Sequence, residues 1–409
     1  MKVRSVTAFV EVSYPLEADA IAHAGDALQA FREALDKAGF TIQTTRLATQ
    51  PFREILGSAG ADRAVDLAKD LAALAFVHEI DYIALGPSRI EDAPSYTLAL
   101  ADVLGGTENI FASVEIADRQ AGLSLPHLRR VASLIRQAAG LQEDGFANLR
   151  LAALANVPPW SPFFPAAYHG GGKTRVAIAT ESADVALEAV SNAASLEQAR
   201  NLFVRAVEAE AKRLENAVQK VAERNGILFQ GIDFSLAPYP VEVRSIGAAL
   251  EKFGLPSVGK AGTLATAAFL TDALDRAHFA RTGFCGLMLP VLEDSVLAQR
   301  AAQGVLRVGD LLAYSAVCGT GLDTIPLPGD VSEGALAAIL LDVAALALRL
   351  DKPLTARLMP LPGKQAGDEV AFEFEYFAHS RVMAPNAEPL EGLLAGDEQF
   401  LIQPRSSPA

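Results

Sequence analysis

The sequence is poor in the residues that would indicate disulfide or metal-cluster chemistry. Its 409 residues include two cysteines, one tryptophan and four methionines. Cys285 and Cys318 lie far apart in sequence, so they provide neither a disulfide framework nor a four-cysteine zinc site. A reducing compartment fits this composition, and we expect a cytoplasmic protein.

Positive charge and long apolar runs are also scarce. Lys and Arg number 35 against 49 Asp and Glu, which gives a net charge of −14. Such a chain repels phosphate backbones, so nucleic-acid binding is not expected. The longest apolar run, Ala335–Leu350, contains Asp342 and falls short of the roughly 18 apolar residues of a membrane span. Met1–Arg4 leads into a strand pattern without the apolar core of a signal peptide, so we expect no membrane association.

Apolar residues make up 51% of the chain and alternate between strand and helix periodicity. Val3–Val12 has a strand pattern, and Glu17–Ala38 has helical spacing that ends at Gly39. This alternation continues along the chain and predicts an α/β fold. Further strands are predicted at Phe40–Leu47, Asp81–Leu85, Asn109–Ile116, Phe146–Asn156, Thr174–Thr180, Ile227–Ile232, Cys285–Leu289, Leu354–Met359 and Val370–Phe374.

Glycine and polar residues are most concentrated between residues 317 and 330. A helical pattern ends at Cys318, and the following glycines allow a tight turn or the close approach of a ligand. We predict a loop in which Asp323 is catalytic and Cys318, Thr320 and Thr324 contact a ligand. The alternative is a helix cap followed by a turn bounded by prolines.

A second candidate stretch is Gly231–Pro238, where a buried strand ends in Asp233 and Ser235 before a proline. Ligands of α/β sheets usually bind at the carboxyl ends of strands, so we predict a catalytic Asp233 and a ligand-binding Ser235. A turn that simply ends the strand is the alternative. The third stretch is a glycine-rich loop in which His169 is a candidate general base and Tyr168 a ligand contact.

Two further charged residues complete the predicted site. Glu293 follows a strand pattern, although it also suits the first turn of a helix. Arg357 lies inside a predicted strand and would bind an anionic ligand or pair with an internal carboxylate. If a metal ion is bound, the oxygen atoms of Asp233, Glu293 and Asp323 suit a divalent cation such as Mg²⁺ or Ca²⁺.

These stretches also carry a family resemblance. Ser161–His169 (SPFFPAAYH), Gly231–Pro238 (GIDFSLAP), Gly283–Asp294 (GFCGLMLPVLED) and Ala316–Asp330 (AVCGTGLDTIPLPGD) resemble the family catalogued as domain of unknown function 711, also called uncharacterised protein family 210. The resemblance implies a homodimer and a fold similar to pyruvate formate-lyase, an α/β barrel of two five-stranded halves. It predicts one barrel domain over residues 1–383. The residues after Met383 are rich in proline and polar side chains, so we expect a loosely held tail over residues 384–409.

The implied barrel raises the question of radical chemistry. Arg381–Pro385 lies where glycyl radical enzymes carry their radical glycine, but Ala384 stands at the glycine position. We therefore expect a non-radical enzyme of lyase or hydrolase type that acts on a small polar metabolite inside the barrel. The alternative is a barrel that binds or senses a small molecule without turnover.

Overall fold

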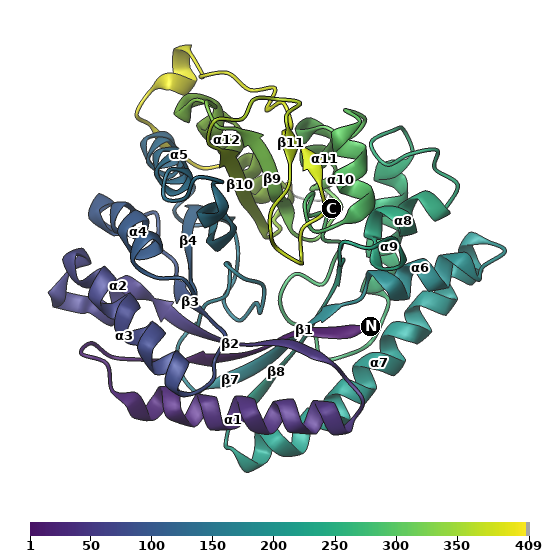
Figure 1. Ribbon diagram of the computed structural model, residues 1–409, viewed down its shortest axis with the longest axis horizontal. Helices are drawn as coiled ribbons and strands as arrows, with labels where there is room; N and C mark the ends of the chain where they lie inside the picture. Colours follow the sequence, from purple (N-terminus) through teal and green to yellow (C-terminus); the bar gives the residue numbers. More distant parts are fainter. Residues whose placement is uncertain (406–409) are drawn as a thin grey trace.

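The computed structural model describes residues 1–405 and contains a central nine-stranded sheet in the order β8-β7-β1-β2-β3-β4-β6-β10-β9. The end of the predicted tail, residues 406–409, lies outside the described part of the chain. Figure 1 shows the strands around the centre of the molecule and the helices around its outside. The predicted mixed α/β fold is confirmed, because most neighbouring strands are parallel and are joined through helices.

The sheet consists of two sets of parallel strands. The first set is β1 (Lys2–Val10), β2 (Ile42–Pro51), β3 (Tyr82–Gly86), β4 (Ile110–Ala117) and β6 (Leu151–Ala155). The second set is β7 (Arg175–Glu181), β8 (Leu228–Ala237), β9 (Gly321–Pro328) and β10 (Leu354–Leu361). The two sets are antiparallel to each other, because β1 pairs with β7 and β6 pairs with β10 in antiparallel fashion. The amino ends of the first set and the carboxyl ends of the second set therefore lie at the same end of the sheet.

The helices carry apolar stripes that pack on the strands. In the first half they are α1 (Ala18–Lys37), α2 (Phe52–Leu56), α3 (Ala64–Val77), α4 (Pro94–Gly106) and α5 (Leu125–Ala139). In the second half they are α6 (Ala183–Ser191), α7 (Leu196–Arg224), α8 (Ile246–Lys252), α9 (Thr263–Asp275), α10 (Ser295–Ala302), α11 (Val308–Tyr314) and α12 (Glu333–Leu350). None of the helices in residues 1–405 has the length and apolar character needed to cross a membrane.

A segment between α9 and α10, residues 281–290, connects the two edges of the sheet and is called the bridging segment below. Ile232 and Leu236 of β8 form isolated parallel bridges to Arg281 and Leu287. Pro290 forms a further bridge to Asp323 of β9. The predicted strand Cys285–Leu289 therefore exists as isolated bridges rather than as a continuous ladder.

Three sequence predictions need correction. The predicted loop around Asp323 is the buried strand β9, which pairs with β10 along its length. The predicted strand Val370–Phe374 is limited to the two residues of β11 (Glu369–Val370), which pair with β12 (Ser380–Arg381).

The third correction concerns the tail, which we expected to be loosely held. Its β13 (Gln399–Phe400) pairs with β5 (Leu123–Ser124). Arg129 donates hydrogen bonds to the carbonyl oxygens of Ala395 and Gly396. These contacts attach the tail to the body of the protein.

Candidate functional site

A cavity of about 480 Å³ opens at the end of the sheet where the two sets of strands bring opposite ends together. The amino-end side of the first set supplies Arg4, Thr44, Arg46 and Tyr82. The carboxyl-end side of the second set supplies Thr180 and Ser235, and Glu293 follows the bridging segment. The volume of this cavity is in the range of small-molecule sites, which is roughly 300–1,000 Å³.

Aromatic side chains form the apolar walls of the cavity. The rings come from the first set of strands, from the 3-10 helix Phe146–Arg150, from the loop over residues 157–172 and from the loop between β11 and β12. They belong to Tyr82, Phe111, Phe146, Phe163, Phe164, Phe374 and Tyr376. Phe111 packs edge-to-face against both Tyr82 and Phe164, with ring centroids 5.2 and 5.5 Å apart.

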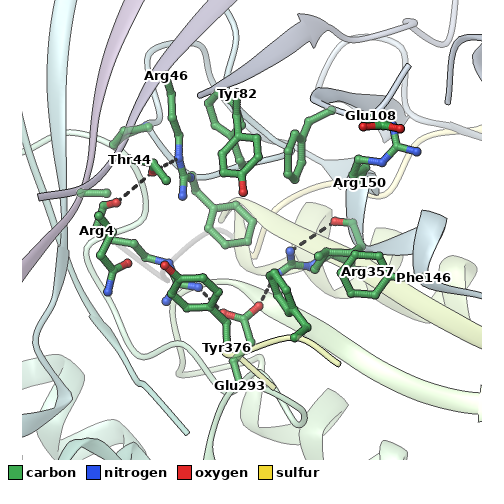
Figure 2. Close-up of a pocket in the computed structure, with 18 of the residues that line it drawn as sticks. Arg4, Thr44, Arg46, Tyr82, Glu108, Phe146, Arg150, Glu293, Arg357 and Tyr376 are labelled. Atoms are coloured by element: carbon green, nitrogen blue, oxygen red, sulfur yellow. Dashed lines mark hydrogen bonds and ion pairs between the residues drawn. The ribbon is translucent and has the colours of Figure 1, made fainter. Parts of the chain in front are cut away.

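A chain of buried ion pairs lies beside these rings. One oxygen of Glu293 accepts a hydrogen bond from Arg4, and the other accepts one from Nη2 of Arg357 at 2.8 Å. Nε of Arg357 donates to Oδ1 of Asp323 at 2.6 Å. Figure 2 shows Glu293 held between Arg4 and Arg357 at the edge of the cavity. Arg357 therefore binds two carboxylates at once.

The two carboxylates of this chain have opposite pKa shifts. Burial alone would raise the pKa of Glu293, but Arg4 and Arg357 outweigh burial and hold this pKa below its ordinary value. Burial raises the pKa of Asp323, and the neighbouring Glu293 adds to that rise against the effect of Arg357. A proton taken up by the pair therefore goes to Asp323, while Glu293 stays ionised.

Arg46 differs from its neighbours because it has no carboxylate partner within residues 1–405. Its Nε donates to Oγ1 of Thr44 at 2.8 Å, and its guanidinium lies 4.9 Å from the ring centroid of Phe164. Figure 2 shows the guanidinium directed into the cavity beside Tyr82. Burial and the nearby Arg4 lower the pKa of Arg46 to about 9, so it is still charged at neutral pH.

Arg150 also lines the cavity, but its hydrogen bonds anchor backbone. Its two terminal nitrogens donate to the carbonyl oxygens of Leu104, Thr107 and Ile110 at 2.8–3.2 Å. Two of these carbonyls lie just after or within the last turn of α4, where a cation is favourable. We therefore assign Arg150 a structural role in shaping the wall.

Three of the residues predicted from sequence line the cavity: Ser235, Glu293 and Arg357. Two other predicted residues, Asp323 and Asp233, do not line the cavity but contact residues that do. Asp323 binds Arg357, and Asp233 accepts a hydrogen bond from the Ser235 hydroxyl at 2.5 Å. The remaining oxygen contacts of Asp233 are the backbone amides of Phe284 and Cys285, at 3.0 and 2.9 Å, so this carboxylate fixes the bridging segment.

The other predicted contacts do not line this cavity. Tyr168 donates to the carbonyl of Val157 at 2.8 Å, and the His169 amide donates to the carbonyl of Thr49 at the carboxyl end of β2. Burial raises the pKa of Tyr168 and lowers that of His169. Both side chains therefore belong to the opposite end of the sheet from Glu293.

Cys318, Thr320 and Thr324 are also buried away from the cavity. The carbonyl of Cys318 accepts a hydrogen bond from Lys352, and Oγ1 of Thr324 accepts one from the amide of Leu292 at 3.3 Å. The carbonyl of Thr320 accepts from Thr355. Thr324 lies within the buried strand β9, and Cys318 and Thr320 lie in the bend just before it, so all three connect β9 to its surroundings.

The three carboxylates predicted to hold a divalent cation do not come together. Glu293 and Asp323 share Arg357, whereas Asp233 is bonded to Ser235 and backbone amides. In the part of the chain that the structure describes, no three His, Cys, Asp or Glu side chains are grouped to hold a metal ion. Arginine occupies the place between the carboxylates that a cation would need.

Sequence reasoning missed Arg4, Arg46 and Tyr82, which lie as single residues in strands of the first half. The available signal was strand periodicity: Thr44 and Arg46 are two residues apart, so they project from the same face of β2. The other residues of β2 are mostly apolar or carry hydroxyl groups. A charged residue such as Arg46 on this strand therefore indicates that the face it shares with Thr44 borders a polar space.

Comparisons with known proteins give a consistent result. The family described as "Uncharacterised ACR (DUF711)" matches residues 1–378. A UPF0210 protein of Pyrobaculum arsenaticum is 37% identical over 83% of this chain and 78% of its own length. One from Methanopyrus kandleri is 32% identical, over 85% of this chain and 80% of the relative. A third, from Acetivibrio thermocellus, is 30% identical over 82% and 77%.

Proposed function

Because this chain belongs to the DUF711 family, whose named relatives carry no stated activity, we propose a function from the cavity itself: a non-radical enzyme of lyase or hydrolase type acting on a small polar metabolite. The observation that carries this proposal is the Arg4–Glu293–Arg357–Asp323 chain at the cavity wall. It offers an ionised carboxylate at the surface of the cavity and, behind it, a second carboxylate whose raised pKa makes it the readier of the two to take up a proton. Two carboxyl groups whose pKa values are driven apart are typical of acid–base catalysis.

The proposed chemistry is proton transfer rather than nucleophilic attack by a thiol. Glu293 is positioned at the cavity, and Arg357 links it to Asp323, which would take up a proton during the reaction. The Cys285 thiol is buried, and burial together with Asp233 raises its pKa to about 12. A thiol in this environment is a poor nucleophile.

One observation favours the alternative, a protein that binds a small molecule without turnover. Both oxygens of Glu293 accept hydrogen bonds from arginines, which weakens this carboxylate as a base. An enzyme would have to loosen one of these two contacts when its substrate enters. A binding protein would keep both.

Turnover separates the two functions. Purified protein would be incubated with an extract of small metabolites, and the mixture followed by mass spectrometry over time. An enzyme consumes one metabolite in large molar excess over protein and forms another, whereas a binding protein depletes a metabolite only stoichiometrically. Product formation should be lost in Glu293→Gln and kept in Glu251→Gln, which breaks the Glu251–Arg300 ion pair outside the cavity. Stoichiometric depletion without any product would contradict the enzyme proposal.

The finer architecture is part of the same proposal. We propose that the bridging segment serves as a tenth strand, which would close the sheet into a barrel like that of pyruvate formate-lyase. The antiparallel arrangement of two parallel sets supports this interpretation. We further propose a cytoplasmic homodimer, and light scattering after size-exclusion chromatography would test it. A monomer mass at micromolar concentration would contradict the dimer.

A further inference from the structure

The charged groups around the cavity do not balance. Arg4, Arg46 and Arg357 contribute three guanidinium groups, whereas Glu293 and Asp323, each ion-paired with Arg357, contribute two ionised carboxylates. Glu181 and Arg244 form a neighbouring ion pair, and Glu108 and Arg150 also line the cavity; each of these two sets adds one charge of each sign and leaves this excess unchanged. The excess is one positive charge, and it resides on Arg46 because this arginine forms no ion pair within residues 1–405.

The surroundings of Arg46 make its charge costly without a partner. Burial and the like charge of Arg4 both disfavour the guanidinium. Its single side-chain hydrogen bond, to Thr44, uses Nε and leaves both terminal nitrogens directed into the cavity. Arg46 is half-buried, so a partner would offset the lost contact with water, and the two-pronged guanidinium matches a carboxylate in geometry. The arrangement is therefore complementary to an incoming anion.

The walls next to Arg46 indicate what the rest of the ligand looks like. Its guanidinium lies over Phe164 and 5.9 Å from the ring centroid of Tyr82, and Phe111 contacts both of these rings. Phe146 and Phe374 face the cavity as well, with their centroids 5.1 Å apart. A ligand that reaches Arg46 therefore places its body against aromatic rings, which favour flat or apolar groups.

We propose that Arg46 is the anchor for the carboxylate of a small, singly charged ligand whose planar or apolar body packs against Tyr82, Phe111 and Phe164. This inference rests on the proposed function, because it names the substrate class for that same cavity. A carboxylate, with one negative charge, neutralises the excess of one positive charge. A phosphate monoester carries about −1.5 to −2 at neutral pH and would leave the cavity negatively charged.

Binding of three probe molecules tests the proposal on the full-length protein. Benzoate has a carboxylate on a ring, benzamide is its neutral isostere, and phenyl phosphate carries more negative charge. Titration calorimetry or ligand-observed nuclear magnetic resonance would measure the affinities. We expect saturable benzoate binding and at least tenfold weaker binding of benzamide. Equal affinities for these two, tighter binding of phenyl phosphate than of benzoate, or no benzoate binding at millimolar concentration would overturn the proposal.

Variants of Arg46 test whether this residue is responsible for benzoate binding. Arg46→Gln should weaken benzoate binding by at least tenfold while keeping the weak benzamide binding, and Arg46→Lys should retain part of the benzoate affinity. Arg63→Gln is the matched control, because Arg63 is exposed and pairs with Asp66 outside the cavity. A melting temperature for Arg46→Gln at or above that of the parent protein would establish that it folds. Unchanged benzoate affinity in folded Arg46→Gln would refute the assignment.

The two proposals fail in different ways. Turnover of a neutral metabolite, insensitive to Arg46→Gln, would leave the enzyme proposal standing and refute the carboxylate anchor. Benzoate binding that depends on Arg46, with no product from any metabolite, would support the anchor and contradict the enzyme.

Discussion

At one end of the sheet polar side chains line a cavity, whereas at the other end they are bonded to the loop over residues 157–172. Phe164, Ala167 and Trp160 of this loop pack among inward-facing residues of the strands, such as Phe9 and Ala48. Its Tyr168 and His169 are fixed there by backbone contacts. The same loop sends Pro162, Phe163 and Phe164 to the cavity wall. The loop over residues 157–172 therefore packs into the end of the sheet opposite to the cavity and also forms part of the cavity wall.

The comparison shows that a polar side chain becomes available to a ligand only when its hydrogen bonds leave space next to it. At the cavity end, Arg46 keeps two donor nitrogens directed into open volume. At the opposite end, His169 is 1% exposed, its Nδ1 accepts a hydrogen bond from the Gly171 amide, and its Nε2 has no partner among residues 1–405. Residue type alone would rank the histidine above the arginine as a catalytic candidate.

The largest difference between the two ends should appear when an ion pair is broken in each. Arg357→Met leaves Asp323 buried without its partner, so we expect a loss of about 3–5 kcal/mol in the free energy of unfolding. Arg89→Met breaks the Arg89–Glu54 pair at the opposite end, where the two side chains are 36% and 49% exposed, and should cost at most about 1 kcal/mol. Urea denaturation measures both. Similar losses for the two variants would contradict the distinction.

The second prediction concerns Glu115, a titrating group at the end opposite to the cavity. Burial and, to a smaller extent, Asp118 raise the pKa of Glu115 from 4.5 to about 7. The folded protein therefore retains a proton that the unfolded chain releases, and stability is lost as the pH rises through this interval. Glu115→Gln removes that loss and should stabilise the protein at pH 8 by up to about 3 kcal/mol, with little effect at pH 4.

Thermal or urea unfolding across pH 4–8 would measure this effect. The stability difference between Glu115→Gln and the parent protein should grow steadily over that range. Parallel pH profiles for the two proteins would mean that Glu115 does not titrate as inferred.

The third prediction tests the charge of Arg46 at the cavity end. Its guanidinium must be protonated to attract a carboxylate, and burial with Arg4 lowers its pKa to about 9. Benzoate affinity should therefore stay nearly constant between pH 6 and 8 and fall above about pH 9, approaching tenfold per pH unit, or ~1.4 kcal/mol. Titration calorimetry at several pH values measures this. Constant affinity up to pH 10.5 would exclude Arg46 as the titrating anchor.

The smallest effect is expected at His169. Burial lowers the pKa of this histidine, so its ring is neutral, and Phe would keep its edge-to-face packing with Trp160. His169→Phe loses one acceptor for the Gly171 amide and gains apolar surface, so the stability change should stay within about 1 kcal/mol. Benzoate affinity and any turnover found by metabolite profiling should be unchanged. Loss of turnover in a folded variant would restore His169 as a catalytic candidate.

Part of the site was accessible from sequence because it lies at strand ends. Ser235 and Glu293 follow predicted strands and reach the cavity, and Arg357 was predicted to lie inside a strand with an internal carboxylate as one possible partner. The stretch around Asp323 was identified as functionally dense but assigned to a loop. Pro326 and Pro328 suggested that loop, although proline is tolerated in β9 because only one side of this strand forms a continuous ladder.

The sequence by itself determined the alternation of helices and strands, because hydrophobic periodicity is a local property that each segment carries alone. It also determined the acidic, cysteine-poor character of the chain. Only the tertiary structure decided that the two sets of strands run in opposite directions, which brings Arg4, Arg46 and Tyr82 opposite Glu293 and Arg357. These residues are up to 353 positions apart in the chain, counting from Arg4 to Arg357. No local pattern encodes that proximity, because it arises from strand pairing between distant segments and from the burial of the ion pairs that this pairing creates.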